Sequence, residues 1–252
     1  DVAMLDNKLG YIFADAANNL IKQANINSNQ VAAIGSHGQT ILHVPTITEK
    51  TSIQISDPNI ICAQTDIVTV ADFRRMDMAF GGEGAPLASS FHKYQFKESD
   101  ESVVVLNIGG FANVTLLPCD KNKIIGFDTG PGNALLDDWI RQNKNVEYDK
   151  DGIWANSGKV DNELLELLLK DKYFSLSIPK STGREYFNLE WLKTNLNKLN
   201  KELPAETIQA TLLKLTAVTI TDAIKQYANG FTKVLVCGGG VNNPLLIKNI
   251  QA

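Results

Sequence analysis

The sequence predicts an α/β protein with a mainly parallel or mixed sheet flanked by helices. Two observations lead to this prediction. Short apolar runs of strand length alternate with longer stretches whose apolar residues recur at helical spacing. Each apolar run also ends in a polar or glycine-rich turn. Such alternation is typical of sheets with helices on their faces, and ligands then bind beyond the carboxyl ends of the strands.

The first part of the chain predicts three helices and three strands. "KLGYIFADAANNLIKQA" carries apolar residues at helical intervals, and "VAAIGSHG" is a short apolar run that enters a polar turn. "TSIQIS" alternates as a strand does, and Pro58 after Asp57 marks a helix start. "DIVTVADFR" predicts a further strand, and "LASSFHKYQF" predicts a further helix.

The charged stretch "KESDES" predicts a boundary between a first domain, residues 1–98, and a second, residues 99–252. After it, "SVVVLNIGGFANVTLLP" predicts strand, tight turn and strand. "NKIIGFDTGPGN" adds a third strand with its loop, and "ALLDDWIRQN" adds a helix. Residues 153–200 are mostly helical, with Asp161 as a cap, and a long helix precedes Asn229 and Gly230. "TKVLVCGGGVNNPLLIKNI" ends the pattern with strand, glycine turn and helix.

Composition excludes several classes of protein. The formal net charge of −4 argues against nucleic-acid binding, because no basic surface is available to neutralise phosphates. No apolar run approaches the ~18 residues of a membrane span, and no signal peptide is recognisable. The three scattered cysteines predict neither a disulfide framework nor a zinc site, but buried, unreactive thiols in a cytoplasmic protein. The chain starts without Met and stops within an apolar helical pattern, so we expect a fragment.

Five predicted strand ends carry polar or glycine-rich segments: "SHGQT", "ADFRRMD", "NIGGFANVT", "DTGPGN" and "CGGGVNN". Glycine lets backbone N–H groups approach a ligand closely, and a row of such groups binds anions. Five such ends in one cleft would surround a ligand that carries phosphate. Neither a GxxxxGK[ST] nor a GxGxxG motif is present, so no single loop decides the function.

Asp128 stands where the strand in "IIGFDTGPGN" should end, and its carboxylate would then face the cleft. It could instead cap the following helix, but Asn133 is nearer the start of that helix and is the better cap. A general base or a metal-linked carboxylate is therefore the favoured role of Asp128. "FDTG" also occurs in aspartic proteases, but they pair two such aspartates and this chain has one copy.

Six motifs in the same order resemble the anhydro-N-acetylmuramic acid kinases, of the sugar-kinase/actin-like ATPase superfamily. The motifs are "GSHGQTILH", "ADFRRMDMAFGGEGAPL", "NIGGFANVTLLP", "GFDTGPGNALLDDW", "PKSTGREYFNLEWL" and "VCGGGVNNPLL". The resemblance covers nearly the whole chain. It implies a two-domain actin-like, ribonuclease-H-like ATPase fold with mixed sheets flanked by helices. It also implies ATP and Mg²⁺ as cofactors and a homodimer.

The resemblance implies that two turns bind the nucleotide. The turn in "NIGGFANVT" would contact the phosphates of ATP, and "CGGGVNN" would hold the adenosine. The residues that match these roles are Asn107, Gly109, Gly110, Asn113, Gly238, Gly239, Gly240 and Asn242.

The reaction that the resemblance implies opens a 1,6-anhydro sugar from peptidoglycan. Water attacks the anomeric carbon, the 1,6 bridge opens, and O6 takes the γ-phosphoryl group of ATP, which gives N-acetylmuramic acid 6-phosphate and ADP. Asp128 matches the catalytic aspartate, which would accept the proton of the water. The candidate substrate-binding residues are His37, Gln39, Asp72, Arg74, Gly130 and Asn133. Asp72 could instead pair with a neighbouring arginine. Lys180, Ser181 and Arg184 are expected near the cleft mouth or a subunit contact.

Two parts of the family pattern are absent. Nothing before Leu9 matches the first phosphate-binding turn, and the chain lacks an acidic helix beyond the adenosine turn. We therefore expect little or no kinase activity from this polypeptide alone, and activity from the intact parent. Two alternatives stay open: a sugar- or nucleotide-binding relative without catalysis, and another sugar kinase of the same superfamily.

Overall fold

The computed structural model describes residues 1–44, 50–96, 101–120 and 123–252. The chain divides into two compact units, Asp1–Gly84 and Ala85–Ala252, which are described separately. The domain boundary predicted between residues 98 and 99 falls outside the described residues. Helix α4 (Ala88–Gln95), which the sequence assigned to the first domain, packs against strands of the second unit.

The first unit contains two separate strand pairs, one parallel and one antiparallel. Strands β1 and β4 are parallel, and β2 and β3 form a hairpin-like pair. Its elements are α1 (Val2–Gln23), η1 (Ser28–Gln30), β1 (Ile34–Ser36), β2 (Gln39–Val44), β3 (Thr51–Ile55), α2 (Pro58–Thr65), β4 (Thr69–Ala71) and α3 (Phe73–Ala79). The predicted helices and strands are present, but β2 and α3 were not predicted, because each directly follows a polar turn.

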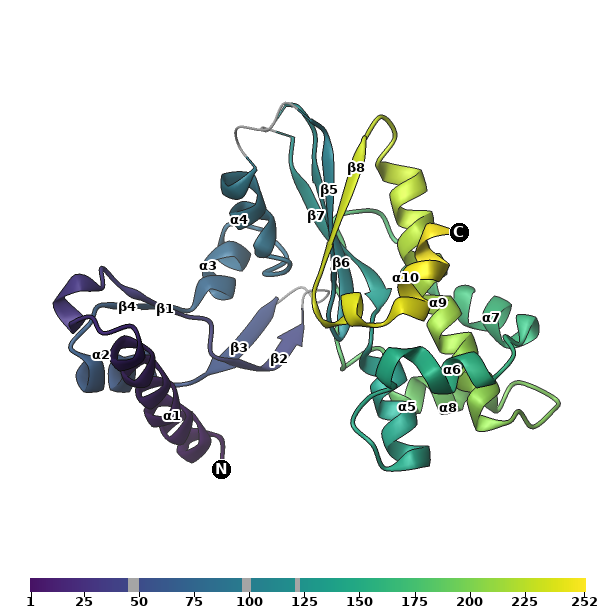
Figure 1. The fold of residues 1–252 in the computed structure, drawn as a ribbon, viewed down its shortest axis with the longest axis horizontal. Coiled ribbons are helices and arrows are strands. Elements are labelled where there is room, and N and C mark those ends of the chain that lie inside the picture. Colours follow the sequence, from purple (N-terminus) through teal and green to yellow (C-terminus); the bar gives the residue numbers. More distant parts are fainter. Residues whose placement is uncertain (45–49, 97–100, 121–122) are drawn as a thin grey trace. The chain divides into compact units, whose positions relative to one another are not determined.

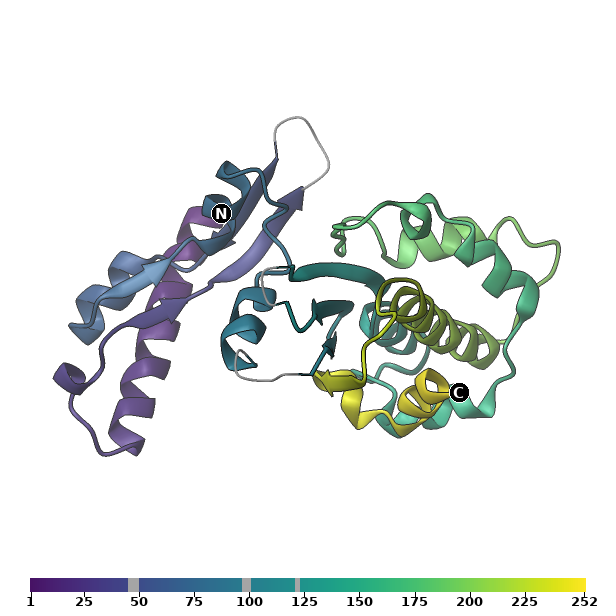
Figure 2. The same cartoon turned by 90° about the horizontal axis from the view of Figure 1, so that it is seen from above.

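Few side chains of the first unit are buried. Helix α1 lies against α2 and β3 (Figure 2), yet within α1 only Gly10 and Ala14 are buried. A Cβ on Gly10 would lie 3.0 Å from the carbonyl oxygen of Asp57, so glycine allows the close approach of α1 to α2. The helix start predicted at Pro58 is confirmed, and the Asp57 side chain caps it by accepting a hydrogen bond from the backbone N–H of Asn59 at 2.8 Å.

The second unit is built on a four-stranded sheet in the order β7-β6-β5-β8. Its strands are β5 (Val103–Ile108), β6 (Phe111–Leu117), β7 (Ile125–Pro131) and β8 (Lys233–Cys237). Strands β5, β6 and β7 are antiparallel neighbours, and β8 pairs in parallel with β5. The predicted strand, tight turn, strand and third strand are thus confirmed, and the sheet is mixed.

Helices follow β7 and cover one face of this sheet (Figure 1). They are α5 (Ala134–Lys144), η2 (Lys150–Gly152), α6 (Ile153–Ser157), α7 (Asn162–Leu169), η3 (Lys172–Ser175), α8 (Leu189–Leu196), α9 (Ala205–Tyr227), η4 (Gly239–Asn242) and α10 (Pro244–Gln251). Asp161 caps α7 as predicted, through a 2.9 Å hydrogen bond from the N–H of Leu164. The α/β class with mixed sheets flanked by helices is confirmed.

Alternate residues of the central strands face opposite sides of the sheet, as the two-residue strand period requires. Val104, Leu106 and Ile108 belong to the large core beneath the helices. Val103 and Val105 face the other side, where a small cluster includes Phe96 just after α4. Asn107, Asn113 and Asp128 are in register on this second side, so their side chains are directed away from the helical core.

One prediction about composition was wrong. Cys62, Cys119 and Cys237 are all exposed rather than buried. No helix in the described part of the chain combines the length and apolar character needed to span a membrane.

Candidate active site

A row of polar residues crosses the second sheet near the carboxyl end of β5. Asn107 on β5 pairs with Asn113 on β6, and Asn113 pairs with Asp128 on β7. Directly opposed residues of neighbouring strands share a face, so these three side chains lie on the same side. Cys237 on β8 continues the row and donates to Asn107 Oδ1 at 3.8 Å. The pairing therefore brings together three predicted site residues from two separate motifs.

Asp128 is 5% exposed, and its carboxylate is held by the segment 180–184. Ser181 Oγ and the backbone N–H of Thr182 both donate to Asp128 Oδ2, each at 2.9 Å. The backbone N–H of Asp128 donates to the carbonyl oxygen of Lys180 at 2.8 Å, so this segment lies along β7. Asp128 is thus not a helix cap, which agrees with the role favoured from the sequence.

Tyr173 and Lys180 hold the backbone around Asp128. Tyr173 donates its hydroxyl proton to the backbone carbonyl of Asp128 at 2.8 Å. Burial and then the nearby charge of Asp128 raise the pKa of Tyr173, so the phenol stays protonated. Lys180 donates to the carbonyl oxygens of Tyr173 and Phe174, at 3.0 and 3.1 Å, and burial lowers the pKa of its ammonium group.

The predicted phosphate turn, Gly109 and Gly110, is clamped by the turn that follows β7. The backbone N–H groups of Gly132 and Ala134 both donate to the carbonyl oxygen of Gly110 at 2.9 Å. A Cβ on Gly132 would lie 2.5 Å from the carbonyl oxygen of Gly109, so only glycine fits there. This packing fixes the phosphate turn relative to the start of α5.

Asn133 occupies the cap position of α5, but its side chain makes no capping hydrogen bond. Its Nδ2 donates instead to the carbonyl oxygen of Gly109 at 3.0 Å. The prediction of a capping side chain was therefore wrong, because the adjacent turn offers an acceptor that the local sequence does not reveal. Gly130 is buried against the ring of Phe174, so packing already explains its lack of a side chain.

The three glycines of the predicted adenosine turn differ in their surroundings. Gly238 has φ +86°, and a Cβ there would lie 2.6 Å from the carbonyl oxygen of Ile108. A Cβ on Gly240 would meet the Ile108 side chain at 2.3 Å, whereas one on Gly239 would meet nothing within 4 Å. Gly238 and Gly240 thus let the turn pack on the end of β5, and Gly239 presents an open backbone surface.

A cavity of about 600 Å³ lies within the second unit beside this turn. Its lining residues are Asn133, Leu136, Asp137, Arg141, Glu147, Tyr148, Asp149, Lys150, Asp151, Gly239, Asn242 and Asn243. Three of them, Asn133, Gly239 and Asn242, were predicted from two different motifs. The cavity has the size of a small-molecule site. It contains the turn assigned to adenosine, together with the residue that holds the phosphate turn.

Asp137 is the titratable group of this cavity with the largest change of pKa. Partial burial raises its pKa to about 6, with Arg141 opposing the shift and Asp138 adding to it. The carboxyl therefore titrates near neutral pH, unlike an ordinary surface aspartate. Asp149 in the same cavity accepts hydrogen bonds from the N–H groups of Trp154 and Ala155, so it holds the start of α6.

Of the substrate residues predicted in the first unit, Arg74 and His37 contact each other, whereas Asp72 and Gln39 contact other residues. Arg74 Nε donates to His37 Nε2 at 2.8 Å, and His37 Nδ1 lies 2.9 Å from the carbonyl oxygen of Gly38. These contacts place the proton of the neutral ring on Nδ1. Asp72 pairs with Arg75 rather than Arg74, through a 2.7 Å contact to Nε. Gln39 is exposed, and its side chain donates to the carbonyl oxygen of its neighbour Thr40 at 3.1 Å.

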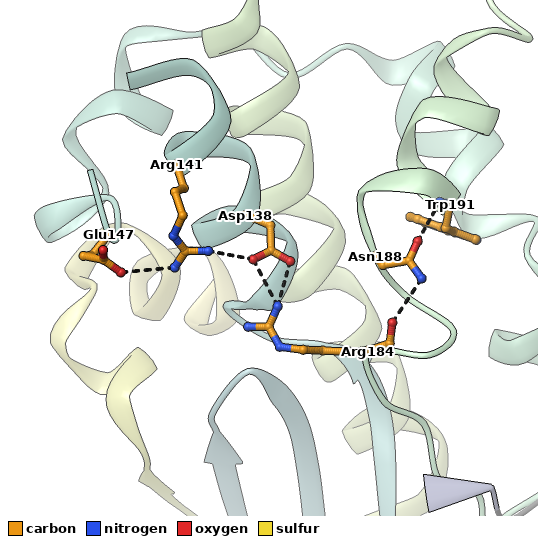
Figure 3. Close-up of polar contacts among 6 residues, drawn as sticks. All are labelled: Asp138, Arg141, Glu147, Arg184, Asn188 and Trp191. Atoms are coloured by element: carbon orange, nitrogen blue, oxygen red, sulfur yellow. Dashed lines mark hydrogen bonds and ion pairs between the residues drawn. The ribbon is translucent and has the colours of Figure 1, made fainter. Parts of the chain in front are cut away.

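Thr182 and Asp138 were not predicted near the site, and Ser181 was expected only near the cleft mouth or a subunit contact. Arg184 Nη1 donates to both carboxylate oxygens of Asp138, at 3.0 and 2.8 Å, and Asp138 also binds Arg141 (Figure 3). The polar, glycine-containing stretch "PKSTGRE" indicated that this segment is functional. The sequence did not indicate that the segment contacts Asp128, because the two are more than fifty residues apart.

No three His, Cys, Asp or Glu side chains gather closely enough to hold a metal ion within residues 1–44, 50–96, 101–120 and 123–252. The residues that line up with Asp128 are the amides of Asn107 and Asn113 and, beyond them, the thiol of Cys237. The donor set at this sheet edge is therefore one carboxylate with two asparagines.

Comparison with known proteins decides the family. The whole chain, residues 1–252, matches the protein family described as anhydro-N-acetylmuramic acid kinase. The chain belongs to this family. The anhydro-N-acetylmuramic acid kinase of Photobacterium profundum is 48% identical over 258 residues, which cover 100% of this chain and 68% of that protein. The kinase of the same name from Shewanella sp. strain ANA-3 is 49% identical, over 98% of this chain and 67% of that protein.

A third anhydro-N-acetylmuramic acid kinase, from Coxiella burnetii, is 48% identical over 98% of this chain and 66% of that protein. The chain thus spans about two thirds of the length of the curated relatives that it matches. Two solved structures are more distant. They are an activator of 2-hydroxyisocaproyl-CoA dehydratase from Clostridium difficile and a ROK family glucokinase from Streptomyces griseus. The activator shows 13% identity and a TM-score of 0.41, covering 86% of this chain and 82% of its own. The glucokinase shows 14% identity and a TM-score of 0.37, covering 94% and 75%.

Proposed function

We propose that the protein, at the full length of its relatives, is an ATP-dependent kinase of a 1,6-anhydro amino sugar. It opens 1,6-anhydro-N-acetylmuramic acid with water and phosphorylates O6, which yields N-acetylmuramic acid 6-phosphate and ADP in peptidoglycan recycling. Family membership supports the substrate, and the environment of Asp128 supports the chemistry. The observation that carries the proposal is a buried carboxylate in register with the strands that form the phosphate turn.

Asp128 is the general base in this proposal. Water is a weak nucleophile and needs a base within hydrogen-bond reach to accept its proton as it attacks carbon. The two donors on Oδ2 keep the carboxylate in one orientation, and the sheet keeps the backbone of Asp128 in place. The proton of the water passes to Asp128 while the C1–O6 bond breaks, and O6 attacks the γ-phosphorus.

The nucleotide would use the cavity of the second unit. Its adenosine would lie against the open side of Gly239 near Asn242, and its phosphates would approach the turn at Gly109 and Gly110. Backbone N–H groups in such turns stabilise anionic oxygens. Magnesium bound mainly by ATP phosphates needs only one or two protein carboxylates, so one carboxylate with two asparagines fits that ion. When bound, Mg²⁺ neutralises charge on the transferred phosphoryl group.

The polar residues of the first unit are separate candidates for binding the sugar. Arg74 donates to His37 at 2.8 Å, and a guanidinium binds a carboxylate with two parallel hydrogen bonds. We assign it to the lactyl carboxylate of the substrate. Gln39, Asp72, Gly130 and Asn133 remain further candidates for the sugar.

The test compares the turnover of the unmodified full-length protein with that of its Asp128→Asn variant. We expect ADP release with the anhydro sugar, and a loss of kcat of about 10²–10⁴-fold in Asp128→Asn with little change in nucleotide affinity. Asp15→Asn, an exposed change on α1, is the matched control. Undiminished turnover by Asp128→Asn would refute the role of Asp128. No turnover by the unmodified protein would favour a binding relative without catalysis.

A substrate panel tests the choice of sugar. Plain N-acetylmuramic acid has no anhydro bridge for water to open, so we expect it to be a far poorer substrate than its anhydro form. Equal turnover of both sugars would indicate another sugar kinase. The same assay, applied to the 252-residue chain alone, tests the expectation that this chain is inactive.

We also propose that the full-length protein is a cytoplasmic homodimer that acts on a small molecule and binds neither nucleic acid nor membrane. The net charge of −4 supports the absence of nucleic-acid binding, because no basic surface is available to neutralise phosphates. Light scattering should give twice the mass of one chain, and a mass of one chain would refute the dimer.

A further inference from the structure

The segment 180–184 holds the proposed general base from a distant part of the chain. The carbonyl oxygen of Lys180 accepts a hydrogen bond from the backbone N–H of Asp128. The Ser181 hydroxyl and the backbone N–H of Thr182 donate to the carboxylate. Both donors bind the same oxygen, Oδ2, so they fix the rotation of the carboxylate about its Cβ–Cγ bond. The direction of the lone pairs that would accept a proton is thereby set before any substrate binds.

Thr182 has a second polar group that the protein leaves without a partner. Its hydroxyl oxygen is buried and makes no hydrogen bond among the described residues, and the residue is only 8% exposed. Its own backbone nitrogen lies 2.9 Å from Asp128 Oδ2, so covalent geometry puts the hydroxyl within about 7 Å of that oxygen. A buried hydroxyl without a partner is costly, and native structures rarely keep one unless a ligand or water binds it.

The far end of the segment is anchored on α5. Figure 3 shows the guanidinium of Arg184 meeting the carboxylate of Asp138, while Asn188 Nδ2 donates to the backbone carbonyl of Arg184 at 3.0 Å. Asp138 is mostly shielded, with 14% of its side chain exposed, and it also binds Arg141. The segment is therefore held at both ends, and Thr182 is not a mobile surface residue.

We propose that the Thr182 hydroxyl binds the attacking water beside Asp128 and that Ser181 is a positioning residue for the carboxylate. This inference rests on the proposed function. In the step concerned, a proton of the water moves to Asp128 and the water oxygen bonds to the anomeric carbon. The C1–O6 bond then breaks, and O6 takes the γ-phosphoryl group from ATP and releases ADP. Thr182 holds the water for this attack and is itself unchanged.

The deciding variant is Thr182→Val in the full-length protein, with Thr182→Ser as the matched control. Valine keeps the branched shape and the backbone N–H that binds Asp128, and it removes only the hydroxyl. We expect kcat to fall about tenfold with the KM for the anhydro sugar unchanged, since one uncharged hydrogen bond is lost. Thr182→Ser should stay within about threefold of the unmodified enzyme, because the hydroxyl is kept.

Stability separates this role from a structural one. Replacing an unpartnered buried hydroxyl by a methyl group should leave the melting temperature unchanged or higher, while activity falls. A lower melting temperature in Thr182→Val would overturn the inference, because the hydroxyl would then serve the fold. Unchanged kcat in Thr182→Val would also overturn it, while turnover by the unmodified enzyme would leave the proposed function intact.

Ser181→Ala provides a second, independent readout. Removing a donor to the charged carboxylate favours its protonated form, so the acidic limb of the kcat/KM profile should move to higher pH. Thr182→Val should leave the position of that limb unchanged, since its backbone donor remains. An unshifted limb in Ser181→Ala would refute the positioning role of Ser181.

Discussion

The two units hold their predicted site residues in different ways. In the second unit, Asp128 is 5% exposed and is held by the neighbouring segment, and the glycine turns pack tightly on β5. In the first unit, His37, Gln39 and Asp72 are exposed, and each contacts a residue that is adjacent or on the surface. The second unit thus has a rigid arrangement in the protein alone. The first unit presents polar groups whose geometry a ligand can still adjust.

This difference indicates where substitutions should damage the fold and where they should damage only binding. A side chain added to a packed turn displaces a buried neighbour, whereas the loss of an exposed side chain leaves its surroundings solvated. The three predictions below test the contrast, from the largest expected effect to the smallest.

The largest effect should come from Gly240→Ala. Its Cβ would lie 2.3 Å from Cγ2 of Ile108, which is fully buried, so the turn or β5 must shift. Overpacking of this kind costs about 1–3 kcal/mol, which corresponds to a fall in melting temperature of several degrees. Gly239→Ala is the control, since nothing lies within 4 Å of its Cβ. It should melt normally but bind nucleotide more weakly in calorimetry. Equal melting temperatures for both variants would contradict the contrast.

An intermediate effect is expected from Arg74→Gln, compared with Arg75→Gln. Arg74 is bound to His37, whereas Arg75 pairs with exposed Asp72 on the same short helix. Removing a charged partner of the sugar carboxylate should raise the KM for the anhydro sugar about tenfold, without lowering the melting temperature. Arg75→Gln should leave both unchanged, because exposed ion pairs contribute little. A larger rise in KM in Arg75→Gln than in Arg74→Gln would show that Arg75, and not Arg74, binds the sugar carboxylate.

The smallest effect concerns pH and Asp137. Its pKa of about 6 in the folded protein exceeds its ordinary value of 3.8, so the folded state keeps the proton longer than the unfolded chain. The resulting stabilisation is present below about pH 4. It is lost as the pH rises to about 6. Asp137→Asn should therefore gain melting temperature relative to the unmodified protein between pH 4.5 and 7. A difference that does not change with pH would show that Asp137 titrates normally.

Much of the second unit could be predicted from local sequence. The antiparallel strands around "NIGGFANVT", the helix after "DTGPGN" and the cap at Asp161 all follow from residue periodicity and turn chemistry. In the first unit, β2 and α3 were missed because each starts at once after a turn, with no intervening signal. The prediction of a capping Asn133 side chain failed because its acceptor, Gly109, is remote in sequence.

The sequence alone determined the order of most of the elements, the family resemblance and the choice of Asp128 as the candidate base, because these depend on residue type and local spacing. The tertiary structure decided what holds Asp128 and which glycines are needed for packing. Ser181 and Thr182 reach Asp128 across more than fifty residues of chain, and only the packing of that segment along β7 brings them together. Local sequence patterns carry no information about such distant partners, since the contact depends on how the whole unit folds.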